Sequence, residues 1–191
     1  MTQEIKFQDG ESYEQWMGVW SQLVGDQFLE WLSPQPNATW IDIGCGNGTF
    51  TEQIYNAHAP KEIQALDPSP EQIDFALQRI RSENVSFQVG DAMNLPFEAH
   101  RFDYATMALV LFFVPDPALG VREMVRVTKP GGSISAYVWD LLEGGLPVEA
   151  ISAQLRQLDI PYPIAPSAEV SRISRLEETW IEAGLESVET I

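Results

Sequence analysis

The 191-residue sequence has one cysteine, two histidines and few basic residues. Its single thiol, Cys45, cannot form an internal disulfide or a multi-cysteine metal site, and His58 and His100 are widely separated. The segment Met1 to Glu4 lacks the basic flank and apolar core of a signal peptide, and no apolar run has the length of a membrane span. We therefore expect a cytoplasmic protein with no metal and no membrane partner.

Positive charge is also scarce, with 11 Lys and Arg against 28 Asp and Glu and a net charge of −17. Residues 1–60 hold eight acidic side chains and one basic side chain, Lys6. Such a field repels phosphate, so nucleic acid and anionic membranes are excluded as expected partners. The hydrophobic content of 45% is ordinary for a globular chain, and the length predicts one domain over residues 1–191.

The sequence does contain a glycine-rich turn between two periodic segments, over residues 38–50. A buried strand ends near Asp42, Gly44, Gly46 and Gly48 follow, and a helical pattern begins at Phe50. A dinucleotide fingerprint has the spacing G-x-G-x-x-G, whereas this turn is G-x-G-x-G after a carboxylate. The difference favours S-adenosylmethionine, which carries an ammonium and a carboxylate, over a pyrophosphate. A glycine turn without any ligand remains the alternative.

Two stretches carry a family resemblance: D-I-G-C-G-N-G-T over residues 42–49 and G-D-A-M-N-L-P-F over residues 90–97. Both resemble class I S-adenosylmethionine-dependent methyltransferases of the generic type 11 group. The resemblance implies an α/β fold, a doubly wound, Rossmann-like and mostly parallel sheet, and S-adenosylmethionine as cofactor. It also implies seven strands, of which this sequence lacks the last. We expect residues 185–191 to pair with the edge of the fifth strand, the alternative being a truncated chain.

The chain divides into four predicted segments. Residues 12–33 are expected to form an N-terminal helix over the site, with an apolar stripe that includes Trp20, Leu23 and Phe28. Residues 38–140 form the cofactor-binding core, in which the apolar run 105–114 is a central strand, 129–132 a turn and 133–140 the fifth strand. Residues 141–172 are an insert or lid, and residues 173–191 a capped last helix and an edge strand.

Further candidate cofactor ligands follow the second and third strands. Asp67 lies nineteen residues beyond Gly48, at the edge where a carboxylate accepts both ribose hydroxyls. The resemblance implies that Asp91 accepts the adenine amine, that Ala92 offers its amide and that Met93 packs on the ring. The predicted cofactor-binding residues are Asp42, Gly44, Cys45, Gly46, Asp67, Pro68, Asp91, Ala92, Met93 and Met107.

Candidate substrate residues are mostly aromatic. The resemblance places the N-terminal helix across the cofactor mouth, with a basic residue near the position of Val19. The predicted substrate residues are Tyr13, Trp16, Phe112, Phe113 and Trp139. Because the fourth strand offers Ala108 and phenylalanines rather than polar side chains, no general base is predicted and an apolar acceptor fits best.

These features together predict methyl transfer from S-adenosylmethionine to a small molecule by direct in-line displacement. Positioning of the acceptor supplies much of the rate, and no covalent nucleophile is needed. Two alternatives stay open, an NAD-dependent oxidoreductase and a non-catalytic or truncated nucleoside-binding module. The chain is expected to be a monomer or a homodimer.

Overall fold

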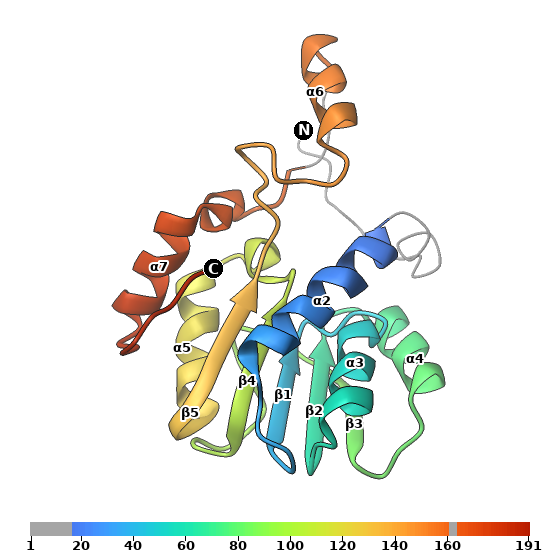
Figure 1. Cartoon of the computed structure of the whole chain (residues 1–191), viewed down its shortest axis with the longest axis vertical. Helices are drawn as coiled ribbons and strands as arrows, with labels where there is room; N and C mark the ends of the chain where they lie inside the picture. The colour runs from blue at the N-terminus through green and yellow to red at the C-terminus, as the bar shows by residue number, and fades with distance from the viewer. Residues whose placement is uncertain (1–16, 161–163) are drawn as a thin grey trace.

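The computed structural model describes residues 17–160 and 164–191. A parallel sheet of five strands in the order β3-β2-β1-β4-β5 forms its centre (Figure 1). The strands are β1 (Thr39–Ile43), β2 (Glu62–Asp67), β3 (Val85–Val89), β4 (Phe102–Ala108) and β5 (Thr128–Tyr137). This order reverses direction beside β1, as in doubly wound α/β folds, so the predicted fold class is confirmed.

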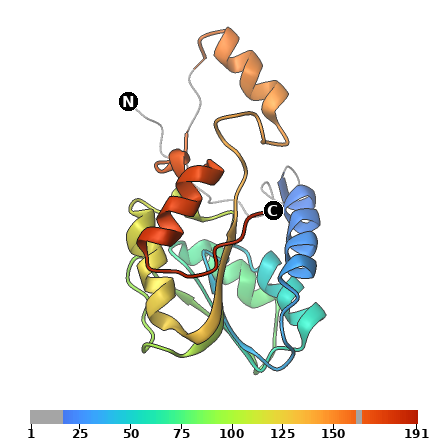
Figure 2. The same cartoon turned by 60° about the vertical axis from the view of Figure 1, so that its left-hand side comes forward.

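Helices cover both faces of the sheet (Figure 2). The helices are α2 (Val19–Leu32), α3 (Thr49–His58), α4 (Pro70–Arg79), α5 (Pro117–Val127), α6 (Glu149–Gln157) and α7 (Ile173–Glu182), with short 3₁₀ helices η2 (Leu111–Phe113) and η3 (Ala168–Ser171). On one face α2 and α3 pack around Phe28, Trp40 and Phe50. On the other face α5 and α7 enclose a larger core that includes Met107 and Trp180.

Two of these helices, α4 and α5, begin at the capping residues that the sequence predicts. The hydroxyl of Ser69 accepts a hydrogen bond from the amide of Gln72, with Pro70 at the first helical position of α4. Asp116 caps α5 in the same way by accepting from the amide of Leu119. These caps fix the chain directions on either side of the sheet's carboxyl edge.

The apolar run 105–114 is not a single strand, which corrects one prediction. β4 ends at Ala108, Leu109 takes a left-handed conformation with φ of 61°, and the chain continues into η2. Leu111 and Phe112 are nevertheless buried, because η2 packs into the core beside α5. Burial, rather than strand pairing, therefore explains the length of the apolar run.

The N-terminal helix also differs from its prediction. Tyr13 and Trp16 lie outside the described residues, and in α2 only Gly25, Phe28 and Leu29 are buried. Trp20 and Leu23 are about half exposed, at 50% and 53%. The second half of α2 packs on α3 through Phe28, whereas its first half extends past the carboxyl edge of the sheet (Figure 1), where Ser21 lines the cavity described below.

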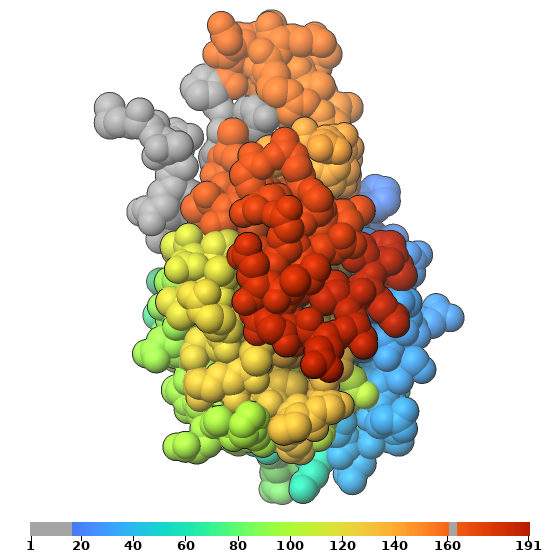
Figure 3. All heavy atoms as spheres, turned by 90° about the vertical axis from the view of Figure 1, so that its left-hand side faces the viewer, coloured from blue at the N-terminus to red at the C-terminus, as the bar shows by residue number. Residues whose placement is uncertain are grey.

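The predicted edge strand over residues 185–191 is absent. Leu185 and Val188 pack against the core, but Ser187 takes a left-handed φ of 57° and Ile191 is 84% exposed. The left-handed residue breaks the extended conformation that edge pairing needs. Figure 3 shows this segment and α7 covering the α5 side of the molecule, with α6 projecting above them.

β5 also departs from its predicted limits. It begins at Thr128, includes the glycine pair predicted as a turn, and ends at Tyr137 rather than at residue 140. Phe102 pairs with Thr128 but Tyr104 pairs with Ser133, so residues 129–132, which include the glycines, form an irregular stretch of the strand. α7 starts after Arg172 without the side-chain cap that was expected.

Candidate functional site

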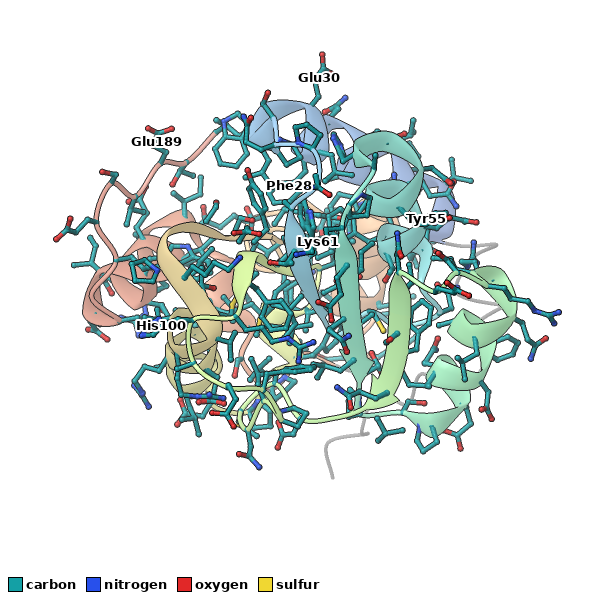
Figure 4. All side chains as sticks on the ribbon, turned by 90° about the horizontal axis from the view of Figure 1, so that it is seen from below. Phe28, Glu30, Tyr55, Lys61, His100 and Glu189 are labelled. Atoms are coloured by element: carbon teal, nitrogen blue, oxygen red, sulfur yellow. The ribbon has the colours of Figure 1, made fainter. Side chains whose placement is uncertain are left out.

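A cavity of about 530 Å³ lies at the carboxyl edge of the sheet. The ends of β1, β2, β4 and β5 meet there, and α2, α3 and α4 contribute side chains. The opposite end, seen in Figure 4, carries Lys61 and His100, far along the strands from the glycine turn. In a doubly wound sheet the carboxyl edge at the strand-order reversal is where ligands bind.

The glycine turn forms one wall of this cavity. Gly44, Gly46 and Gly48 all have positive φ, at 76°, 52° and 83°. A Cβ at Gly44 would lie 2.5 Å from both γ-carbons of Val110, whereas a Cβ at Gly46 would meet only Gln72 Oε1, at 4.0 Å. Gly44 therefore allows the β4 loop to pack, and Gly46 leaves its open side to the cavity.

Asp42 is a fully buried carboxylate on the cavity floor. Its Oδ2 accepts a hydrogen bond of 2.6 Å from the hydroxyl of Thr51, but its Oδ1 has no partner in the described chain. Burial raises the pKa of Asp42 to about 7; the Thr51 hydrogen bond opposes this rise and the charge of Asp67 adds to it. The buried Oδ1 is therefore an acceptor on the cavity wall that the protein itself leaves available to a donor.

Asp67 ends β2 on the opposite side of the turn. Its two oxygens accept from the amide of Gly46 at 3.0 Å and from the amide of Ser69 at 2.9 Å. Burial raises its pKa, and these two amide bonds partly counter the effect. Each oxygen keeps a second lone pair, so the carboxylate can still accept two hydroxyls.

The thiol of Cys45 lines the same wall but is not poised for chemistry. Burial raises its pKa well above the ordinary value, and the charges of Asp42 and Asp67 add to the rise. The thiol is therefore neutral and a poor nucleophile.

The structure brings together about half of the predicted site residues. Asp42, Gly44, Cys45, Gly46, Asp67, Pro68 and Phe113 line the cavity. Met107 and Phe112 do not, because both side chains are buried in the α5-side core, and Trp139 packs against that core as well.

The predicted adenine segment lies next to the cavity without lining it. The amide of Gly90 donates to the carbonyl of Asp67 at 3.1 Å, which sets Asp91 beside the end of β2. The carboxylate of Asp91 accepts from the amide of Met93 at 2.8 Å and so stiffens the turn that contains Ala92.

Sequence reasoning missed much of the lining. The missed residues lie in the glycine turn, on α2 and α3, at the start of α4, and at or just after the ends of β4 and β5, and they are Ser21, Asn47, Thr49, Phe50, Gln53, Ser69, Pro70, Glu71, Gln72, Ala108, Leu109, Val110 and Tyr137. The alternation of side chains between the two faces of β5 could have predicted that Tyr137 lies at the site. Its ring packs on the rings of Phe28 and Phe50, with centroid distances of 4.8 and 5.7 Å.

The fold and the site define a doubly wound protein with a cavity at the strand-order reversal, lined by two buried or half-buried carboxylates. The family description "methyltransferase domain" matches residues 41–136, half of the chain, so the chain belongs to the methyltransferase-domain family. This assignment confirms the resemblance seen in the glycine turn.

Proteins similar to this chain in sequence or in structure also have names that describe methyltransferases. A demethylmenaquinone methyltransferase of Bacillus cytotoxicus is 31% identical over 155 residues, 79% of this chain and 63% of the relative's own length. A Methanococcus maripaludis structure described as an S-adenosyl-L-methionine-dependent methyltransferase aligns with a TM-score of 0.71 at 21% identity, covering 100% of this chain and 91% of the other. A Haemonchus contortus phosphoethanolamine N-methyltransferase 2, solved with S-adenosylhomocysteine, aligns at 0.70 with 20% identity over 93% of this chain and 42% of its own.

The structure adds two findings on what is absent from residues 17–160 and 164–191. Among these residues, no group of three or more His, Cys, Asp or Glu side chains is arranged to hold a metal ion. Within the same ranges, no helix combines the length and the apolar character needed to cross a membrane.

Proposed function

We propose that this chain binds S-adenosylmethionine in the cavity and directs transfer of its methyl group to a small, uncharged or cationic acceptor in the cytoplasm. The observation that carries the proposal is the pair of carboxylates on either side of the open face of Gly46. Asp42 offers an acceptor oxygen without a partner, which suits an ammonium, and Asp67 keeps lone pairs for two ribose hydroxyls. The cavity residues thus fit the cofactor that the family uses.

The remaining cofactor contacts follow from the strand ends. Gly44 to Gly46 would hold the amino-acid part, and Asp91, Ala92 and Met93 would hold the adenine after the β3 end. When bound, the cofactor supplies a methyl group that is already electrophilic. The chain's own task is then to align the acceptor and to exclude water, which in oriented reactions contributes roughly 7 to 11 kcal/mol.

The acceptor side of the cavity is apolar. Leu109, Val110, Phe113 and Tyr137 line it, and no Lys, Arg or His does so among the described residues. This lining supports an apolar acceptor without phosphate groups, and the relatives' name, demethylmenaquinone methyltransferase, suggests a ring of the quinol kind.

Replacement of Asp67 by Asn tests the cofactor assignment. Loss of the charged acceptor is expected to weaken S-adenosylhomocysteine binding by about 1 to 3 kcal/mol, measured by isothermal titration calorimetry. Asp74→Asn, which removes an exposed carboxylate on α4 outside the cavity, is the matched control. Unchanged affinity in a folded Asp67→Asn protein would remove Asp67 from the site.

Two further measurements separate the alternatives. Binding of NAD in preference to S-adenosylmethionine would favour the oxidoreductase, which the family assignment disfavours. Formation of S-adenosylhomocysteine with a demethylated quinol would exclude a non-catalytic binding module.

A further inference from the structure

The first half of α2 forms part of the cavity wall but is not anchored in the core. It lines the cavity through Ser21, whereas the buried residues of α2 are Gly25, Phe28 and Leu29. Among the described residues 19–24, none is buried, and α2 begins without a side-chain cap. Packing alone therefore does not hold this wall of the cavity in place.

The side-chain amide of Gln53 attaches this half of α2 to α3. Gln53 lies on α3, the helix that follows the glycine turn, and it lines the cavity itself. Its Nε2 donates to the backbone carbonyl of Gln22 at 2.8 Å and to Oδ1 of Asp26 at 2.6 Å. Both partners are acceptors, so the two hydrogens of this amide group are both used. One side chain of the cavity wall thus joins α2 to the helix that carries the glycine turn.

The same contact explains why a glycine, Gly25, lies in the middle of α2. Glycine makes a helix less stable than alanine does. A Cβ at Gly25, however, would lie 2.5 Å from Oε1 of Gln53 and 3.1 Å from both Cδ and Nε2 of that side chain. The amide of Gln53 therefore occupies the space that any larger residue would fill, and the helix-weakening residue lies where this amide packs against α2.

We infer that Gln53 is a positioning residue, which holds the first half of α2 against the cavity through Gln22 and Asp26 and so completes the binding site before a ligand arrives. The inference rests on the proposed function. A wall that is already ordered in the free protein costs the ligand no conformational entropy, whereas a frayed wall must be ordered on binding. Gln53 thus acts on affinity through the position of α2 and not through a contact of its own with the ligand.

Replacement of Asp26 separates these two ways of acting. Asp26 accepts from Gln53 but is exposed and is not among the described residues that line the cavity. Asp26→Ala is expected to weaken S-adenosylhomocysteine binding about fivefold, measured by isothermal titration calorimetry. Asp26→Asn keeps an acceptor oxygen and should retain most of the affinity. The matched control is Glu30→Ala, which removes another exposed carboxylate of α2 (Figure 4) and should leave the affinity unchanged.

Replacement of Gly25 distinguishes positioning from a general loss of stability. In Gly25→Ala the added methyl group should displace the Gln53 amide from α2, while alanine stabilises the helix itself. Gly25→Ala and Gln53→Ala are both expected to bind S-adenosylhomocysteine about tenfold more weakly. The urea unfolding midpoint should nevertheless be higher in Gly25→Ala than in Gln53→Ala. The double variant should bind no more weakly than either single variant, because both changes break the same contacts.

Hydrogen exchange shows whether α2 is the element that changes. In the unmodified chain, the backbone amides of residues 23–26 should be protected with or without S-adenosylhomocysteine. In Gln53→Ala and Gly25→Ala, these amides should exchange about tenfold faster without the ligand and should regain protection when it is bound. The amides of residues 29–32, in the half of α2 that packs in the core, should not change.

The outcomes separate this inference from the proposed function. Unchanged affinity in folded Asp26→Ala and Gly25→Ala would overturn the inference alone. Weaker binding by Gln53→Ala with normal binding by Asp26→Ala would also overturn it, because Gln53 would then act by its own contact with the ligand. If S-adenosylhomocysteine does not bind the unmodified chain, the proposed function fails and the inference fails with it.

Discussion

Replacement by alanine is expected to have different effects at two glycines of the same turn, Gly44 and Gly46. Gly44 and Gly46 both have positive φ, but an added Cβ would collide with protein atoms only at Gly44, where the γ-carbons of Val110 lie 2.5 Å away. We expect Gly46→Ala to fold and to lose cofactor binding, because its methyl group would project into the cavity. Gly44→Ala is expected to lose stability first, because its methyl group would collide with Val110.

The magnitudes follow from the backbone and from the contacts. An alanine in the left-handed region costs about 1 to 2 kcal/mol, and about 0.4 to 1 kcal/mol of this is recovered because the unfolded chain loses freedom. Gly46→Ala should therefore destabilise by between about 0 and 1.6 kcal/mol. In Gly44→Ala, contacts of 2.5 Å to both γ-carbons add an overpacking cost of about 1 to 3 kcal/mol.

Urea unfolding and calorimetric titration with S-adenosylhomocysteine measure the two effects separately. Gly46→Ala should bind at least tenfold more weakly, which is about 1.4 kcal/mol, with an unfolding midpoint lowered less than that of Gly44→Ala. Adding Val110→Ala to Gly44→Ala should restore part of the lost stability, and a double-mutant cycle reports this coupling. Normal binding by Gly46→Ala, or equal stability of the two single variants, would refute the reasoning.

Two further predictions concern stability. Ala59 ends α3 with a left-handed φ of 42°, so Ala59→Gly should raise the free energy of unfolding by about 0.5 to 1 kcal/mol, whereas Ala57→Gly, inside the same helix, should lower it by about 1 kcal/mol, both read from urea midpoints. Burial alone would raise the pKa of Asp103, but hydrogen bonds from Lys129 and Thr39 outweigh it and lower the pKa from 3.8 to about 2. Because the folded value lies below the unfolded one, the stabilisation is complete above about pH 4 and is lost as the pH falls through 2. Asp103→Asn should flatten this part of the acid-unfolding profile, and an unaltered profile would contradict the assignment.

The sequence predicted those parts of the fold that depend on local chemistry. The glycine turn after β1, the caps at Ser69 and Asp116 and the carboxylate at the end of β2 all lie where the pattern indicates. Each of these features is determined by residues a few positions apart, so a short window of sequence contains the cause.

The failures came from features that depend on distant contacts. The stripe of α2 has helical periodicity, yet Trp20 and Leu23 are exposed because the helix extends past the sheet. Phe112 belongs to a hydrophobic run that reads as a strand, but Leu109 turns the chain and η2 buries the ring by another route. Periodicity reports that a residue has an apolar environment and does not report which element supplies it.

The site also combines features that neighbouring residues determine with features that distant contacts determine. The sequence shows that a carboxylate lies near the end of β1, but it does not show the hydrogen bonds or the neighbouring charges of that carboxylate. Asp42 receives one hydrogen bond from Thr51, nine positions later on α3, and faces Asp67 from the neighbouring strand. Had the fold supplied a second donor to Oδ1, the carboxylate would be satisfied within the protein and would leave no free acceptor at the cavity. The unsatisfied oxygen is therefore a property of how β1, β2 and α3 assemble, and a short window of sequence does not contain it.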